Sequence, residues 1–109
     1  MRIEFFEPPM CCSTGICGPS VDERLVRLQE NIETLKSKYE GIEIYRYMIS
    51  QQPLKFRVNK EVYTIVQEQG RKSLPITTFN RKVISVSEYP TLEELEKLIK
   101  ESGNEQSED

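Results

Sequence analysis

The sequence contains no histidine, and its three cysteines all lie within one stretch of seven residues. A structural zinc site normally takes four cysteine or histidine ligands, so this chain would need Glu7 or water to complete one. The Cys-x-x-Cys pair that is usual in thiol–disulfide oxidoreductases is also missing. Three clustered thiols in a reducing compartment are expected to stay free, which indicates ligand or redox chemistry rather than a structural disulfide.

The chain also lacks any apolar run long enough to span a bilayer. Its N-terminus is too short and too charged for a signal peptide, so we expect a cytoplasmic protein. A length of 109 residues suits one compact domain with a modest core. The net charge of −3 argues against a strong electrostatic footprint for nucleic acid, and no helix-turn-helix pattern is present.

Apolar spacing and capping residues predict alternating strands and helices. Ser20 and Thr91 each begin a capping box, while Asn59 is a typical helix cap. The segment 54–58 fits no single element. The predicted elements are a strand over 2–6, a helix over 20–40, a strand over 42–47, a helix over 59–70, strands over 76–79 and 83–86, and a helix over 91–102.

The predicted order is therefore β-α-β-α-β-β-α, an α/β fold. A helix joins the first two strands, which makes them parallel, and the last two form a hairpin through Asn80-Arg81. The resulting four-stranded mixed sheet resembles the thioredoxin fold. That fold has its reactive cysteines after the first strand and a cis-proline before the third. Pro75 matches this position, so we predict a cis Leu74–Pro75 bond.

The segment from Met10 to Pro19 reads Met-Cys-Cys-Ser-Thr-Gly-Ile-Cys-Gly-Pro and makes a compact set of soft ligands. Trivalent arsenic and antimony keep a lone pair and accept three sulfurs on one side. Arsenous acid condenses with three thiols to a neutral trithiolate and water, so no buried counter-charge is needed. Adjacent residues of a strand point to opposite faces, so the chain must turn here, and Gly15 and Gly18 allow it to do so.

Other chemistries of these thiols stay open. Copper(I) accepts two or three thiolates. A disulfide between Cys11 and Cys12 closes a small strained ring, and one from Cys12 to Cys17 is sterically possible at an unusual spacing. Free cysteines are also buried for packing alone, although three in one glycine-containing segment make that a minority explanation. Thiol–disulfide exchange is the alternative activity.

Residues 5–18, with Cys-Cys-Ser-Thr-Gly-x-Cys-Gly at their centre, resemble the ArsD family of arsenical-resistance proteins. The resemblance continues through Gln51-Gln52-Pro53, Leu74-Pro75 and Tyr89-Pro90, and so covers nearly the whole chain. This chain lacks the vicinal cysteine pairs that some members carry near the C-terminus.

The resemblance implies a metallochaperone rather than an enzyme. It implies that As(III) or Sb(III) is bound as cargo by Cys11, Cys12 and Cys17, with no organic cofactor. The partner would be the ATPase subunit of an arsenite efflux pump, to which the metalloid passes. Weak trans-acting repression of the arsenic-resistance operon, through DNA binding that the metalloid releases, and a homodimer are implied as well.

These expectations assign residues 1–102 to a thioredoxin-like metalloid-binding domain and 103–109 to an acidic, disordered tail. DNA binding has little support from the residues themselves. Seven basic residues could gather on one face, although solvated surface is their expected role: Lys55, Arg57, Lys60, Arg71, Lys72, Arg81 and Lys82.

Overall fold

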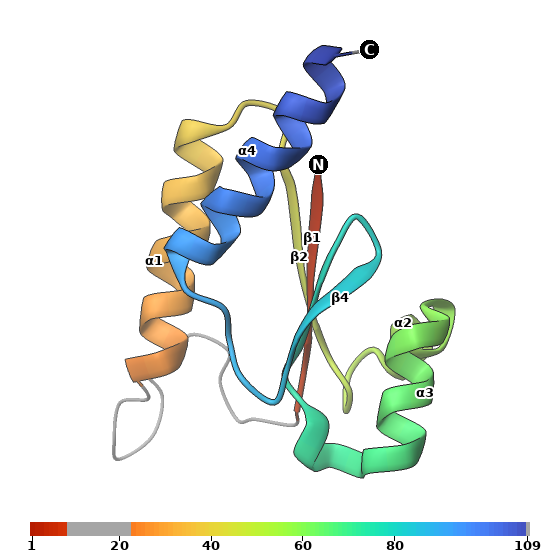
Figure 1. Cartoon of the computed structure of the whole chain (residues 1–109). Helices are drawn as coiled ribbons and strands as arrows, with labels where there is room; N and C mark the ends of the chain where they lie inside the picture. Colours follow the sequence, from red (N-terminus) through yellow and green to blue (C-terminus); the bar gives the residue numbers. More distant parts are fainter. Residues whose placement is uncertain (9–22, 109) are drawn as a thin grey trace.

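A four-stranded mixed sheet forms the centre of the computed structural model, which describes residues 1–8 and 23–108 (Figure 1). The strand order is β2-β1-β3-β4, so the first strand of the chain is central. It pairs in parallel with β2 and antiparallel with β3, and β3 and β4 form a hairpin. The strands are β1 (Arg2–Glu7), β2 (Glu43–Met48), β3 (Ile76–Phe79) and β4 (Lys82–Val86).

Helices cover both faces of this sheet. Figure 1 shows two long helices side by side on one face, and a shorter pair beside the hairpin on the other. The long pair is α1 (Glu23–Lys38) and α4 (Leu92–Glu108); the short pair is α2 (Pro53–Val58) and α3 (Lys60–Gln69), followed by the 3₁₀ turn η1 (Gly70–Ser73).

The apolar stripe of α1 packs against the alternate side chains of β1. Successive strand residues point to opposite faces, so Ile3 and Phe5 face α1 and α4, while Phe6 faces α2 and α3. The larger core joins these strand residues to the two long helices, through Leu28, Ile32 and Leu35 of α1 and Leu95 and Ile99 of α4.

The second core is smaller and more aromatic. Phe6 lies edge-on to Phe56 of α2, with 5.2 Å between ring centroids, and stacks at a tilt on Tyr47 of β2. Val62 of α3 and Ile76 of β3 complete it. Because both cores contact β1, every residue from Ile3 to Glu7 is buried.

Several local predictions are confirmed. The Leu74–Pro75 bond is cis, and Asn80 and Arg81 both have positive φ in the β3–β4 turn. The Asn59 side chain accepts hydrogen bonds from the first N–H groups of α3, and Thr91 accepts one from the Glu94 N–H at 3.2 Å. The four-stranded mixed sheet confirms the predicted α/β, thioredoxin-like class.

Other predictions need adjustment. The unassigned segment 54–58 is helix α2, which begins at Pro53, where the absence of an N–H costs nothing. The backbone of α4 continues past Gly103 to Glu108, further than the predicted end of this helix. The division into a domain over 1–102 and a tail over 103–109 stays a prediction, and the Ser20 cap lies outside the described residues. None of the helices in the described ranges is both long and apolar enough to cross a membrane.

Truncating Leu95 tests the larger core. Leu95 is fully buried between α4 and the sheet, whereas Leu98 on the same helix is only partly buried. We expect Leu95→Ala to lower the free energy of unfolding by about 2–5 kcal/mol in urea titrations. Leu98→Ala, the matched control, should lose distinctly less, and equal losses would contradict this packing.

Candidate metalloid site

The predicted ligands follow directly after the central strand. β1 ends at Glu7, Pro8 comes next, and the described chain resumes in α1 at Glu23. The three cysteines, with Gly15 and Gly18, fall between these points and lie outside the described residues, so Cys11, Cys12 and Cys17 stay predicted ligands. The structure describes the scaffold from which this segment leaves and to which it returns.

A buried carboxylate marks the end of β1. Glu7 is only 2% exposed. Its two oxygens accept hydrogen bonds from Arg46 Nε at 2.7 Å and Nη2 at 2.6 Å, which is a bidentate ion pair. The Tyr89 hydroxyl also donates to Glu7 Oε1 at 2.5 Å. A carboxylate at this depth is tolerated only when it is paired and hydrogen-bonded in this way.

The pKa values of Arg46 and Tyr89 are both raised, so both groups keep their protons. Burial alone lowers the pKa of Arg46, but the hydrogen bonds and charge of Glu7 outweigh it and raise the pKa above its ordinary value. Burial, with the neighbouring charge of Glu7, raises the pKa of Tyr89 far above its ordinary value. Arg46 therefore stays a cation and Tyr89 a neutral hydrogen-bond donor at all physiological pH values.

Three separate segments supply this cluster. Arg46 comes from β2, where it lies opposite Phe5 in the parallel register. Tyr89 comes from the connection between β4 and α4, and its ring contacts Phe5 at 6.3 Å between centroids. Sequence reasoning did not identify Arg46 or Tyr89 as parts of this site. The available indication was the acidic Glu7 at the end of an apolar strand, which needs a partner if the strand is central.

The cis-proline lies at the same edge of the sheet. Pro75 directly precedes Ile76, which pairs with Phe6, so it lies beside the end of β1. The backbone around it is hydrogen-bonded to the end of β4, since the Ser87 N–H donates to the Ser73 carbonyl at 2.9 Å. The structure therefore brings Pro75 to the point where the cysteine segment begins.

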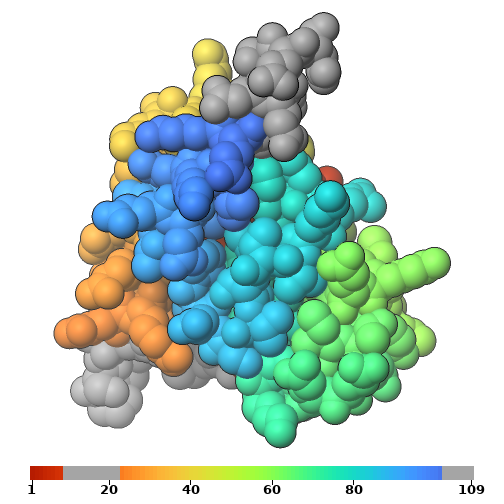
Figure 2. Space-filling view, viewed as in Figure 1, coloured from red at the N-terminus to blue at the C-terminus, as the bar shows by residue number. Residues whose placement is uncertain are grey.

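A cavity of about 550 Å³ lies on the α1 side of Tyr89. Arg24, Arg27, Leu28 and Asn31 of α1 line one wall, and residues 88–93 line the other. Figure 2 shows this connection lying against the first turns of α1. Within residues 1–8 and 23–108, no group of three or more histidine, cysteine, aspartate or glutamate side chains is placed to hold a metal ion.

Comparison with known proteins decides the family. The family model described as arsenical resistance operon protein ArsD matches residues 1–109. The chain belongs to the ArsD family. Two Escherichia coli proteins named arsenical resistance operon trans-acting repressor ArsD are 36% and 33% identical to it over 90 residues, which are 83% of this chain and 73% of each relative.

A solved structure agrees with this assignment. The crystal structure of an arsenical resistance operon trans-acting repressor from Bacteroides vulgatus superimposes with a TM-score of 0.78 at 34% identity. The superposition covers 88% of this chain and 89% of the Bacteroides vulgatus chain. The names of these ArsD relatives describe regulators of arsenical resistance rather than enzymes.

Removing the charge of Glu7 tests the buried cluster. We expect Glu7→Gln to lower the free energy of unfolding by about 3–5 kcal/mol, because it leaves the Arg46 cation without its counter-ion. Tyr89→Phe should cost about 1.5–3 kcal/mol, the range for a lost hydrogen bond to a charged group. Urea denaturation measures both.

Glu88→Gln is the control, since Glu88 is exposed and next to Tyr89 in sequence. It should change the free energy of unfolding by no more than about 0.5 kcal/mol. A Glu7→Gln protein as stable as this control would show that the ion pair does not hold the end of β1.

Proposed function

We propose that this chain is a cytoplasmic arsenic(III) and antimony(III) metallochaperone whose ligands are Cys11, Cys12 and Cys17. The observation that carries the proposal is the Cys-Cys-Ser-Thr-Gly-Ile-Cys-Gly run in a chain that matches the ArsD family over its whole length. The buried Glu7–Arg46 pair supports it, because it gives the cysteine segment a rigid point of departure.

Capture is a condensation at the three thiols. Each thiol replaces one hydroxyl of arsenous acid, an As–S bond forms as an As–O bond breaks, and one water leaves per sulfur. Arsenic stays trivalent, and the trithiolate is neutral. A set of three soft sulfur donors without histidine or carboxylate suits such a thiophilic centre better than a hard cation.

Delivery would follow the same chemistry in steps. An acceptor thiol of the efflux-pump ATPase attacks arsenic, one As–S bond to the chaperone breaks, and the proton of the incoming thiol passes to the leaving sulfur. Three such exchanges transfer the metalloid without any redox change. The transferred group therefore needs no external oxidant or reductant.

Weak trans-acting repression is the second activity of the proposal. Its support is the repressor names of the relatives in Escherichia coli and Bacteroides vulgatus. The metalloid-free homodimer would contact operator DNA, and metalloid binding would release it. Repression and chaperoning would then respond to the same three thiols.

Thiol–disulfide exchange is the alternative function. The position of Pro75 beside the end of β1 favours it, since a proline at this place accompanies reactive cysteines in thioredoxin-like folds. The lack of a Cys-x-x-Cys pair weighs against it. Catalytic reduction of insulin disulfides by the protein, with dithiothreitol supplying the electrons, would support this alternative over the metallochaperone.

Arsenic-edge X-ray absorption tests the ligand set. With one equivalent of arsenite, the reduced protein should show a shell of three sulfurs. Each of Cys11→Ser, Cys12→Ser and Cys17→Ser should lose one sulfur from that shell. Ser13→Ala, a neutral change in the same segment, is the control and should keep all three.

A shell of oxygens in the unaltered protein would contradict metalloid binding. Retention of three sulfurs in any one of the cysteine variants would contradict the assignment of that residue.

Transfer to the ATPase needs its own test. The arsenic-loaded protein is mixed with the purified ATPase subunit and a small-molecule chelator, and the three are separated by gel filtration. We expect the arsenic to elute with the ATPase subunit and none of it with the chelator. The Cys17→Ser variant should deliver less, because it loses a sulfur through which the metalloid is held. Arsenic that stays with the chaperone, or that appears first on the chelator, would contradict direct hand-over.

A further inference from the structure

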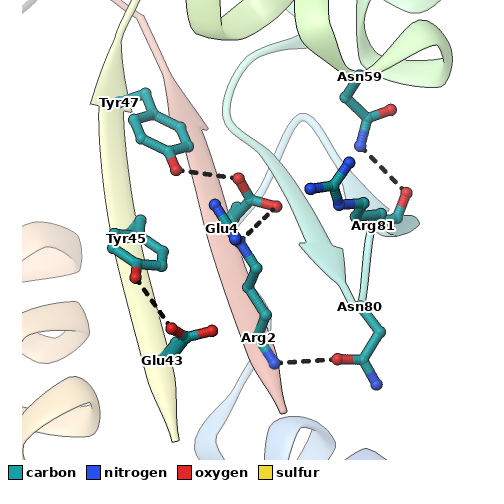
Figure 3. A network of polar contacts seen from close by, with 8 residues as sticks. All are labelled: Arg2, Glu4, Glu43, Tyr45, Tyr47, Asn59, Asn80 and Arg81. Carbon is teal, nitrogen blue, oxygen red and sulfur yellow. Dashed lines mark hydrogen bonds and ion pairs between the residues drawn. The ribbon is translucent and has the colours of Figure 1, made fainter.

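A second cavity, of about 280 Å³, lies on the opposite face of the sheet from α1 and α4. On this face, neither α2 nor α3 lies over the first half of β1, where the side chains of Arg2 and Glu4 project (Figure 3). Arg2 and Glu4 of β1, Tyr47 of β2 and Arg81 of the β3–β4 turn line it, together with residues 58–61 and Lys55. This cavity has no part in the proposed thiol chemistry.

Three cations at this cavity have no carboxylate partner within residues 1–8 and 23–101, whose side chains the structure describes. Arg2–Glu4, Lys38–Glu96 and Arg46–Glu7 are ion pairs among the described residues. Lys55, Lys60 and Arg81 are exposed and form none of them. Three of the seven basic residues singled out from the sequence are thus brought to one opening. The Lys55 ammonium also lies over the Tyr47 ring, 5.7 Å from its centroid, while the residue stays exposed.

The acidic groups of the cavity are already engaged. Glu4 accepts a hydrogen bond from the Tyr47 hydroxyl at 3.0 Å and pairs with Arg2 at 3.4 Å. Glu61 accepts one from the Val83 N–H at 3.3 Å. The Val83 N–H is neutral and leaves the charge of Glu61 in place. The four cations Arg2, Lys55, Lys60 and Arg81 therefore exceed the carboxylates Glu4 and Glu61 by two charges at this cavity.

Arg81 occupies a conformation that its side chain does not favour. Its φ is 73° and that of Asn80 is 50°, the pattern of a two-residue turn in which glycine is the usual second residue. An arginine in this position suggests that its side chain is kept for a purpose other than stability. Figure 3 shows this side chain extending from the turn back over the cavity face of the sheet.

Hydrogen bonds hold that turn rigidly in place. The Asn59 side chain donates to the Arg81 carbonyl at 3.1 Å, from the start of α3. The Arg2 N–H donates to Asn80 Oδ1 at 2.9 Å, and the Asn80 N–H donates to the Arg2 carbonyl at 2.7 Å. The cation of Arg81 is therefore presented from a fixed backbone, beside those of Lys55 and Lys60.

We propose that Lys55, Lys60 and Arg81 form the surface that contacts the phosphodiester backbone of duplex DNA. The inference rests on the proposed repressor function and assigns its DNA-contacting surface. Lysine and arginine side chains neutralise backbone phosphates and fix a protein on the duplex without a helix-turn-helix motif. An open, preorganised and locally basic face on a mildly acidic chain favours contact with the phosphates on this side.

The test measures DNA affinity against salt concentration. The reduced, metalloid-free full-length protein is titrated into two fluorescein-labelled duplexes, one from the promoter of its own operon and one of scrambled sequence. Anisotropy is read at salt concentrations from about 50 to 200 mM. We expect Lys55→Gln/Lys60→Gln to flatten the slope of log K against log salt by about 1.8, or about 0.9 for each lost phosphate contact.

Arg81→Gly separates binding from folding. It removes the charge, keeps the carbonyl that accepts from Asn59 and places glycine where positive φ is unstrained. We expect it to flatten the salt slope by about 0.9 and yet to raise Tm by about 4 °C. Arg81→Lys should restore the slope.

The control is Lys97→Gln/Lys100→Gln on α4, which removes the same charge from exposed residues on the other face. Its slope should match that of the unaltered protein. If the control flattened the salt slope as much as the Lys55→Gln/Lys60→Gln variant, the assigned surface would be wrong. The same would follow if the Lys55→Gln/Lys60→Gln and Arg81→Gly variants bound DNA like the unaltered protein. Either result would leave the proposed repression standing. Failure of the unaltered protein to bind either duplex would overturn both, while metalloid binding is read separately by X-ray absorption.

Discussion

The buried charge of Glu7 is the constraint on which the functional end of the molecule depends. β1 has strands on both edges and helices on both faces, so its last residue lies in the interior. A carboxylate there is stable only with the guanidinium of Arg46 and the hydroxyl of Tyr89. Three segments far apart in the sequence therefore meet where the chain leaves the sheet for the predicted ligands.

Local features of the sequence predicted most of the fold. The apolar spacing of α1, the Asn59 cap and the Asn80-Arg81 turn depend on neighbouring residues alone, so they can be read without the tertiary structure. The shorter α2 was not predicted, because six residues are too few to show a helical period. Glycine at position 103 does not end α4, since a single glycine inside a helix costs only about 1 kcal/mol.

Some functional features could be predicted from the sequence, and others needed the tertiary structure. The ligand prediction came from a contiguous run of residues and from family resemblance, and both are properties of the sequence. The Glu7 cluster was not predictable, because its partners lie 39 and 82 residues away and leave no periodic pattern. The seven basic residues looked equivalent in the sequence, and only the tertiary structure sets Lys55, Lys60 and Arg81 apart.

The strand order also has a consequence for how the protein is made. β1 is synthesised first, but its antiparallel neighbour begins only at Ile76. A nascent chain on the ribosome therefore carries its central strand, and the thiols that follow it in the sequence, without a complete sheet until most of the protein has been translated. Long-range pairing of this kind slows folding.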